Sequence, residues 1–348
     1  MMIKQIVVVF WTLGLIACSN VDHSNSGVNG SLLENELEDA SDSYAANSEV
    51  QSFIGKLVKE HDYDRDTLEL AFSHIKVRPN VIEKSDNQPE VLVPYYEYKK
   101  RFVTKARAES GREFAERNQY WLQKAEQEFG VEPNIIVALI GVETYYGRIT
   151  GSKDVFTSLT TLAFDYPRRK EYFQSELEAY LLLAREKQWS IGVTKGSYSG
   201  AMGMVQFMPS NYRKLAIDYD ENGHIDLWKS EADAIGSAAN YLKHHGWQNN
   251  QPWFVTAQVA DPVKVEKEIN RGRKADTEMN VWSSYNVLPT QSFSLGKTGL
   301  VALRTGPEEV TYWLAYENFF TIMDYNPSRR YAMSVLELAQ SIGKYESY

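Results

Sequence analysis

Glu143 is the residue whose type and position most suggest catalysis. It follows Pro133 and the apolar run 135–142, and it precedes Thr144-Tyr145-Tyr146-Gly147. A proline in the first turn and a glycine as a stop predict a helix between them. Because nearly every position before Glu143 is apolar, we expect this helix to be buried on most sides, and burial should raise the pKa of the carboxyl. Such a group suits a glycosidase acid that must be protonated near neutral pH. The alternative is a glutamate that is solvated or paired with Arg148.

A second group of oxygen-bearing side chains, in the loop 218–226, has the spacing of an EF-hand calcium site. Oxygen ligands stand at positions 1, 3, 5 and 9, glycine makes the turn at position 6, and position 7 would offer its backbone carbonyl. These residues are Asp218, Asp220, Asn222, Asp226, Gly223 and His224. Position 12 is Lys229 instead of a bidentate glutamate, so we expect a longer loop, 218–233, closed by Asp233 or, as second choice, by Glu231. With no paired second loop nearby, the calcium would be structural. The alternative is an acidic, solvated turn.

Between these two features lies a glycine-rich stretch, residues 196–209. Small residues at this density let a backbone approach a partner closely, and Ser197 and Gln206 could face a ligand. The stretch lacks the Gly-Lys-Ser/Thr ending of a phosphate loop. A tight packing turn is the alternative.

The first eighteen residues have the pattern of a bacterial lipoprotein signal peptide. Lys4 precedes an apolar stretch, 6–17, that is too short to span a bilayer comfortably. It ends in Leu15-Ile16-Ala17-Cys18, which resembles a lipobox, and Cys18 is the only cysteine of the chain. Lipidation of Cys18 would place the protein in the periplasm, and Ser19 favours the outer membrane. Residues 19–50 are rich in Ser, Asn, Asp and Glu and predict a flexible tether.

Composition and apolar periodicity predict a mainly α (α+β) fold over residues 51–348. The net charge of −9 argues against a nucleic-acid surface as the main function. Helical spacing recurs at 53–58, 114–129 and 177–183, and again at Val310–Phe320 and Tyr331–Ile342. Residues 261–312, in which Val263 and Val265 alternate, predict a small β-containing insertion.

Several separated motifs together resemble the membrane-bound lytic murein transglycosylase B family. They are GVETYYG, TLAFDYPRR, GSYSGAMGMVQFMPS, DYDENGHIDLW, DAIGSAANYLKHHGW and YNPSRRYAM. The resemblance runs from about residue 53 to the C-terminus. It implies a lysozyme-like core flanked by a helical subdomain and a small α/β subdomain. It also implies cleavage of the β-1,4 bond between N-acetylmuramic acid and N-acetylglucosamine in peptidoglycan.

Carried over position by position, the resemblance implies a role for each matching residue. The catalytic glutamate is Glu143, and Arg168 and Arg169 would face acidic stem peptides. The substrate groove would contain Ser197, Gln206, Tyr325, Asn326, Tyr331 and, as a weaker match, Tyr98. The calcium ligands would be Asp218, Asp220, Asn222, His224 and Asp233. Without the resemblance, core packing would explain the two C-terminal tyrosines, and a solvated ion pair would explain the arginines.

The resemblance also implies a reaction with a single carboxylate and no cofactor for the chemistry. Glu143 would act first as acid and then as base, the substrate's N-acetyl group would assist, and a 1,6-anhydromuramic acid end would form. The alternatives are a hydrolytic muramidase on the same fold and a non-catalytic, peptidoglycan-binding lipoprotein. Expected partners are peptidoglycan glycan strands, a membrane through the lipid anchor, and other cell-wall enzymes.

Overall fold

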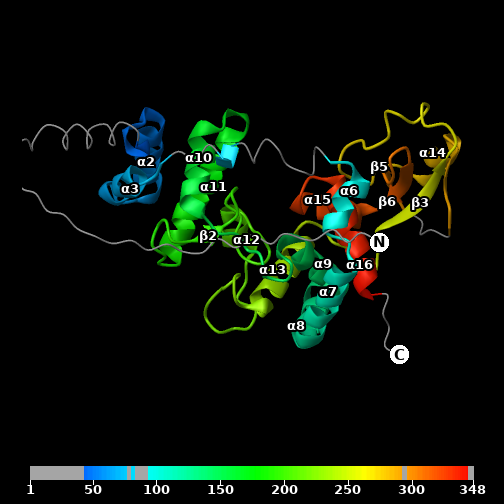
Figure 1. Cartoon of the computed structure of the whole chain (residues 1–348), viewed down its shortest axis with the longest axis horizontal. Coiled ribbons are helices and arrows are strands. Elements are labelled where there is room, and N and C mark those ends of the chain that lie inside the picture. The colour runs from blue at the N-terminus through cyan, green and yellow to red at the C-terminus, as the bar shows by residue number, and fades with distance from the viewer. Residues whose placement is uncertain (1–42, 77–79, 83–92, 292–295, 344–348) are drawn as a thin grey trace, which may run out of the picture. The chain divides into compact units, whose positions relative to one another are not determined.

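A computed structural model describes residues 43–76, 80–82, 93–291 and 296–343. Cys18, the predicted signal peptide and residues 19–42 of the predicted tether lie outside the described residues. Most of the described chain is helical, which confirms the predicted mainly α fold (Figure 1). None of the described helices combines the length and the apolar character that a membrane crossing requires.

The folded part begins before the expected boundary at residue 51. A 3-10 turn, η1 (Tyr44–Ala46), leads into α2 (Ser48–His61), and α3 (Arg65–Ser73) follows. The side chain of Asn47 accepts hydrogen bonds from the backbone N–H groups of Glu49 and Val50, which caps α2. Tyr44 is buried and donates a hydrogen bond to Asp165. A cap and a single buried aromatic therefore order a segment whose polar composition predicted a tether.

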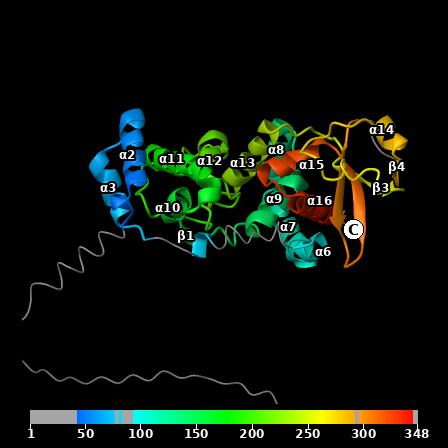
Figure 2. The same cartoon turned by 90° about the horizontal axis from the view of Figure 1, so that it is seen from above.

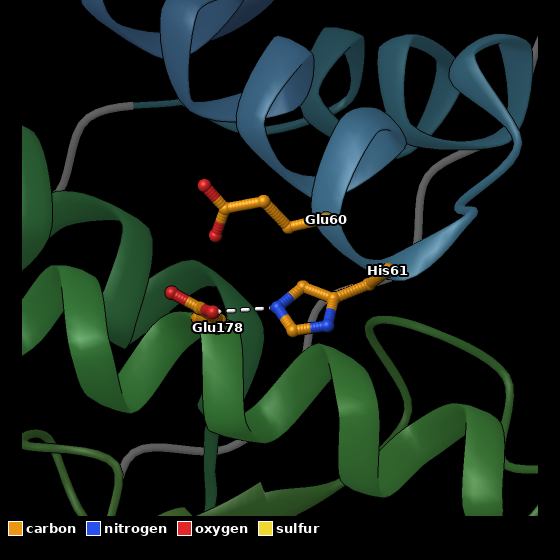
Figure 3. Close-up of side chains that lie close together, drawn as sticks. All are labelled: Glu60, His61 and Glu178. Atoms are coloured by element: carbon orange, nitrogen blue, oxygen red, sulfur yellow. Dashed lines mark hydrogen bonds and ion pairs between the residues drawn. The ribbon is translucent and has the colours of Figure 1, made fainter.

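The N-terminal helices pack against two later helices, α10 (Val155–Asp165) and α11 (Lys170–Glu186). Phe53 and Phe72 both contact Phe164, with ring centroids 5.8 and 6.4 Å apart. An ion-pair network joins α2 to α11. Glu178 accepts a hydrogen bond from His61 Nε2 at 2.7 Å (Figure 3), and it accepts a second one from Lys56 Nζ at 2.6 Å. The expected helical subdomain is thus assembled from segments about a hundred residues apart in sequence.

A second group of helices surrounds α9 (Pro133–Thr144), the helix that carries Glu143. Its neighbours in sequence are α7 (Lys105–Arg117) and α8 (Gln119–Phe129), and its neighbours from later in the chain are α13 (Glu231–His244) and α16 (Arg329–Gly343) (Figures 1 and 2). Residues 135–142 of α9 are all buried. Four covering helices explain why this helix is apolar on every side. The remaining helical segments are α6 (Tyr95–Tyr98), η2 (Lys99–Arg101), η3 (Pro167–Arg169), α12 (Pro209–Leu215), α14 (Met279–Ser284) and α15 (Glu317–Tyr325).

The β-containing insertion is present, but its bounds differ from the predicted 261–312. Its antiparallel sheet has the order β4-β3-β6-β5, built from β3 (Phe254–Val259), β4 (Val287–Pro289), β5 (Gly299–Arg304) and β6 (Val310–Ala315). The alternation of Val263 and Val265 lies in a turn region outside these strands, with Val263 80% exposed. The expected helix Val310–Phe320 is wrong in its first half, which is β6. The short strands β1 (Lys153–Asp154) and β2 (Lys195–Gly196), which α10 and α11 separate in sequence, pair antiparallel in a separate two-stranded sheet.

Candidate active site

Glu143 is the penultimate residue of α9, and the chain turns sharply just after it. Tyr145 and Tyr146 both have left-handed backbone conformations, with φ of 53° and 59°, so the helix ends before the expected stop at Gly147. The hydroxyl of Thr144 donates to the carbonyl of Met204 at 2.8 Å, and it accepts from the N–H of Gly147 at 3.1 Å. Two consecutive non-glycine residues in this region are uncommon and cluster at functional sites. The turn fixes Glu143 against the glycine-rich stretch.

Two tyrosines from the C-terminal part of the chain surround the Glu143 carboxylate. Tyr331 is buried in α16, and its hydroxyl donates a hydrogen bond to Oε1 of Glu143. Tyr325, at the end of α15, donates to the carbonyl of Val205. Burial, and then the adjacent Glu143 charge, raise the pKa of both phenols well above the ordinary value. Both tyrosines therefore stay protonated and act as hydrogen-bond donors beside Glu143.

The glycine-rich stretch forms a compact turn that presents Ser197 and Gln206. The N–H of Ser197 donates to the carbonyl of Ala201 at 2.8 Å, and a side chain on Gly203, which has φ of 71°, would lie 2.6 Å from the Leu227 carbonyl. Gln206 also has a positive φ of 48°, and its Nε2 donates to Thr150 and Gly203 carbonyls. Because its amide nitrogen is used by the backbone, the oxygen of the amide is left to accept from a ligand.

Glu143 opens into a cleft of about 850 Å³ between the helical core and the β-containing insertion. Among the described residues, it is the only carboxylate that lines this cleft. The basic residues of the lining are Arg169, Arg304, Arg329 and Arg330, and its aromatic residues are Tyr95, Tyr172, Tyr198 and Tyr325. The arrangement offers the Glu143 carboxyl as proton donor and acceptor, positive charge for an acidic ligand, and the partly exposed rings of Tyr172, Tyr198 and Tyr325 for a sugar, whereas Tyr95 is fully buried.

The 218–233 loop has the internal hydrogen bonds of a cation-binding turn. Ligand atoms of Asp218, Asp220 and Asp233 all lie within 4.8 Å of one another. Asp233 is fully buried, and its two oxygens accept from the N–H groups of Tyr219 and Asp226 at 2.8 Å each. Burial, with a smaller effect of the Asp220 charge, raises the pKa of the Asp233 carboxyl. A bound cation would offset both effects, so this donor set fits a hard divalent ion.

The hydrogen-bond partners of Glu231 and Asp233 distinguish the two possible closing ligands. Glu231 is bound by the Arg117 guanidinium, with two contacts of 3.1 Å and one of 2.8 Å, and it also accepts from Asn118. The Glu231 carboxylate is therefore bound to Arg117 and Asn118 and does not join the acidic groups of the 218–233 loop. Asp233 is the third residue of α13, and its N–H donates to the capping Ser230 hydroxyl. Its carboxylate lies close to those of Asp218 and Asp220.

Comparison with known proteins defines the family of the chain. The family model described as transglycosylase SLT domain matches residues 45–340. The chain belongs to this SLT-domain transglycosylase family. Membrane-bound lytic murein transglycosylase B of Escherichia coli K12 is 38% identical over 309 residues, which cover 86% of this chain and 84% of the relative. The predicted enzyme family is thereby confirmed.

Solved structures of SLT-domain transglycosylases have the same fold. The Escherichia coli lytic transglycosylase Slt35 in complex with bulgecin A is 38% identical with a TM-score of 0.78, covering 86% of this chain and 94% of that chain. The catenated lytic transglycosylase SltB1 from Pseudomonas aeruginosa is 35% identical with a TM-score of 0.79, covering 86% and 99%. Slt35 has also been solved in complex with calcium, at 38% identity, a TM-score of 0.76 and coverage of 86% and 94%. The predicted lysozyme-like fold is confirmed.

In this SLT-domain transglycosylase, the predicted catalytic and substrate-groove residues fall into four positions. Those that line the cleft are Glu143, Arg169, Ser197, Gln206, Tyr325 and Asn326. Tyr331 lies beneath the cleft and reaches it only through Glu143, while Arg168 is exposed outside the lining. Tyr98 is completely buried and packs on Phe102, with ring centroids 5.0 Å apart, so it offers no surface to a sugar in this structure.

The sequence reasoning missed several residues of the cleft. Tyr95 and Tyr172 come from segments on either side of Glu143 in the chain, and Asn270 and Arg304 come from the β-containing insertion. No local motif marks them, because the cleft forms only when these segments pack together. Arg330 stood in the quoted YNPSRRYAM motif and could have been proposed from its charge beside Asn326.

Proposed function

We propose that Glu143 is the single acid/base of a lytic transglycosylase that cleaves the β-1,4 bond between N-acetylmuramic acid and N-acetylglucosamine. The observation that carries this proposal is that Glu143 is the only carboxylate in the described lining of the cleft. Retaining and inverting glycosidases need a second carboxylate, as nucleophile or as base. With one carboxylate in the described lining, the second group would come from the substrate, and the N-acetyl group of muramic acid would supply it.

The reaction then proceeds in two proton transfers at Glu143. Protonated Glu143 donates its proton to the glycosidic oxygen as the C1–O bond breaks, and the N-acetyl oxygen stabilises the positive charge that develops at C1. The Glu143 carboxylate next takes the proton of the C6 hydroxyl, whose oxygen bonds to C1 and closes the 1,6-anhydro ring. The acid is regenerated, no water is consumed, and the intramolecular attack has a large proximity advantage over attack by solvent. Tyr331 holds the carboxylate in place throughout.

The other cleft residues would bind and orient the glycan strand. Ser197, Gln206 and Asn326 offer hydroxyl and amide groups for the N-acetyl and hydroxyl groups of the sugars. Arg169, which lines the cleft, and the exposed Arg168 would pair with the carboxylates of stem peptides. One relative of known structure, SltB3 from Pseudomonas aeruginosa, was solved in complex with NAG-NAM-pentapeptide. That complex supports peptidoglycan as the substrate class of this chain.

We further propose that the 218–233 loop holds a structural calcium ion. The ligands would be the side chains of Asp218, Asp220, Asn222 and Asp233 with the backbone carbonyl of His224. The calcium complex of Slt35 supports this choice of ion. The ion would supply positive charge between the buried carboxylate of Asp233 and the half-buried carboxylates of Asp218 and Asp220, and it would take no part in the glycan chemistry.

For the location, we propose a periplasmic enzyme anchored through lipidated Cys18 to the outer membrane. The lipobox pattern and the membrane-bound character stated for the Escherichia coli relative support the anchor. Association with other cell-wall enzymes remains a prediction.

The acid/base assignment is tested by Glu143→Gln, which keeps the shape of the side chain and removes the titratable proton. The variant should bind purified peptidoglycan as the wild type does and should lose at least about 1000-fold in cleavage rate. A variant that cleaves at the wild-type rate would refute the assignment.

A further inference from the structure

A second pocket, of about 1010 Å³, is partly formed by the 218–233 loop and shares no lining residue with the catalytic cleft. One side of this pocket comes from the 186–195 segment that follows α11, and the other comes from residues 223–229. Trp189 and Trp228 lie in its wall, both half-buried, and Val193 is 59% exposed at its edge. Both indoles also pack against the main hydrophobic core, and their exposed parts form an aromatic wall of the pocket.

The two indoles are held rigidly. Their ring centroids lie 5.8 Å apart at 77°, and Trp189 also packs edge-on against Tyr212 at 5.7 Å. Trp228 Nε1 donates to the Lys195 carbonyl at 3.0 Å, and the Tyr212 hydroxyl donates to the Ile225 carbonyl at 2.8 Å. Because Trp228 Nε1 is already bonded within the protein, the Trp228 indole offers the pocket apolar ring surface and no hydrogen-bond donor. Rigid ring faces suit the apolar face of a pyranose, since little entropy is lost on binding.

The charge of the pocket is positive although the whole chain carries −9. Lys187, Lys195 and Lys229 line it, and none of them has a salt bridge within the described part of the chain. Of the two acidic residues of the lining, Glu186 is paired with Arg213 at 2.6 Å, and Asp226 accepts from the backbone N–H groups of Trp228 and Lys229, so the three lysines outnumber the carboxylates. Lys187 acts on the neighbouring Glu186 carboxyl, whose pKa it helps to lower, so the exposed ammonium groups of Lys195 and Lys229 are the charges that would attract an anionic ligand.

We propose that this pocket is an accessory binding site for a second segment of peptidoglycan, a glycan strand that carries acidic peptides. The inference rests on the proposed function for the substrate class, and it adds a site outside the cleft. The tryptophans would pack on sugar rings while the lysines pair with peptide carboxylates. A second contact on a polymeric substrate raises the effective concentration of strands at the cleft without changing the chemistry there.

The test measures binding to purified sacculi by co-sedimentation of the full chain carrying Glu143→Gln. In that background, the double change Lys195→Gln/Lys229→Gln removes two exposed charges from the pocket. The matched control, Lys214→Gln/Lys243→Gln, removes two exposed charges elsewhere. We expect the pocket variant to bind sacculi at least about five-fold more weakly and the control to bind within about two-fold of its parent.

With Glu143 restored, the pocket variant should cleave a short soluble glycan at the parental rate and sacculi more slowly. Equal binding of the pocket and control variants to sacculi would overturn the accessory site. A parallel fall in short-glycan cleavage would also overturn it, because the pocket would then belong to the cleft. Soluble fragments are measured in the same samples. If Glu143→Gln releases fragments, the acid/base assignment fails, and this result is independent of the binding comparison.

Discussion

The hydroxyl of Tyr331 donates a hydrogen bond to Oε1 of Glu143 across 188 positions of sequence. Because Tyr331 is buried and stays protonated, it stabilises the carboxylate form of Glu143 in a fixed orientation. Tyr331 acts through Glu143 and is a positioning residue.

Tyr331→Phe tests this role with the loss of one hydroxyl. The variant should lose about 10- to 100-fold in kcat with little change in KM, because a hydrogen bond to a charged group is worth about 1.5–3 kcal/mol. Removing a donor to the ionised form of Glu143 should also move the pH–rate profile toward higher pH. A merely structural role would lower the melting temperature and leave the shape of the profile unchanged.

The calcium proposal predicts opposite results for two acidic residues in the first turn of α13. Asp233→Asn should abolish the rise in melting temperature on adding calcium, because Asp233 closes the ligand set. Glu231→Gln serves as the matched control, since Glu231 binds Arg117 instead. It should keep the calcium response. Both variants are measured by thermal unfolding with calcium or with a chelator. Loss of the calcium response in Glu231→Gln alone would make Glu231 the closing ligand instead of Asp233.

The link between α2 and α11 makes a prediction about stability and pH. Partial burial by itself would raise the pKa of Glu178, but hydrogen bonds from Lys56 and His61 bring it below its ordinary value. A carboxyl with a lowered folded-state pKa stabilises the protein above its unfolded pKa, and this contribution is lost as pH falls through the folded one.

Glu178→Gln should therefore cost about 1 kcal/mol of unfolding free energy at pH 7, measured by urea denaturation. The difference from wild type should shrink as the pH falls below about 4.5. Glu69→Gln is the control, because Glu69 pairs with Arg65 on the exposed surface of α3 and should matter little. A cost that is the same at all pH values would contradict the ion-pair account.

The fold was predictable from the sequence where a pattern of apolar residues is compatible with only one type of secondary structure. The apolar run before Glu143 predicted a buried helix, and α9 is buried because four helices pack around it. Val310–Phe320 was ambiguous, because a short apolar and aromatic run fits a buried helix or a strand. Pairing with β3 and β5, together with the β-prone Val310 and Thr311, made its first half a strand.

The site was predictable where its residues share a local motif, and less so where distant segments meet. The spacing of the acidic residues in the 218–233 loop predicted a calcium site, which stays a prediction. The sequence analysis put Asp233 before Glu231 as closing ligand, and the ion pair of Glu231 with Arg117, more than a hundred residues earlier, supports that order. The Tyr331–Glu143 bond likewise required tertiary packing. Tyr98 matched the family by position, yet its side chain is enclosed by the core.

The central claim is that Glu143 cleaves glycan strands alone, with the substrate closing a 1,6-anhydro ring in place of water. Mass spectrometry of sacculi digested by the purified full chain tests this claim most directly, with Glu143→Gln as the blank. We predict muropeptides that end in 1,6-anhydromuramic acid and therefore lack the mass of one water, and none from the blank. Reducing-end muropeptides as the main products would contradict the claim and make the enzyme a hydrolytic muramidase.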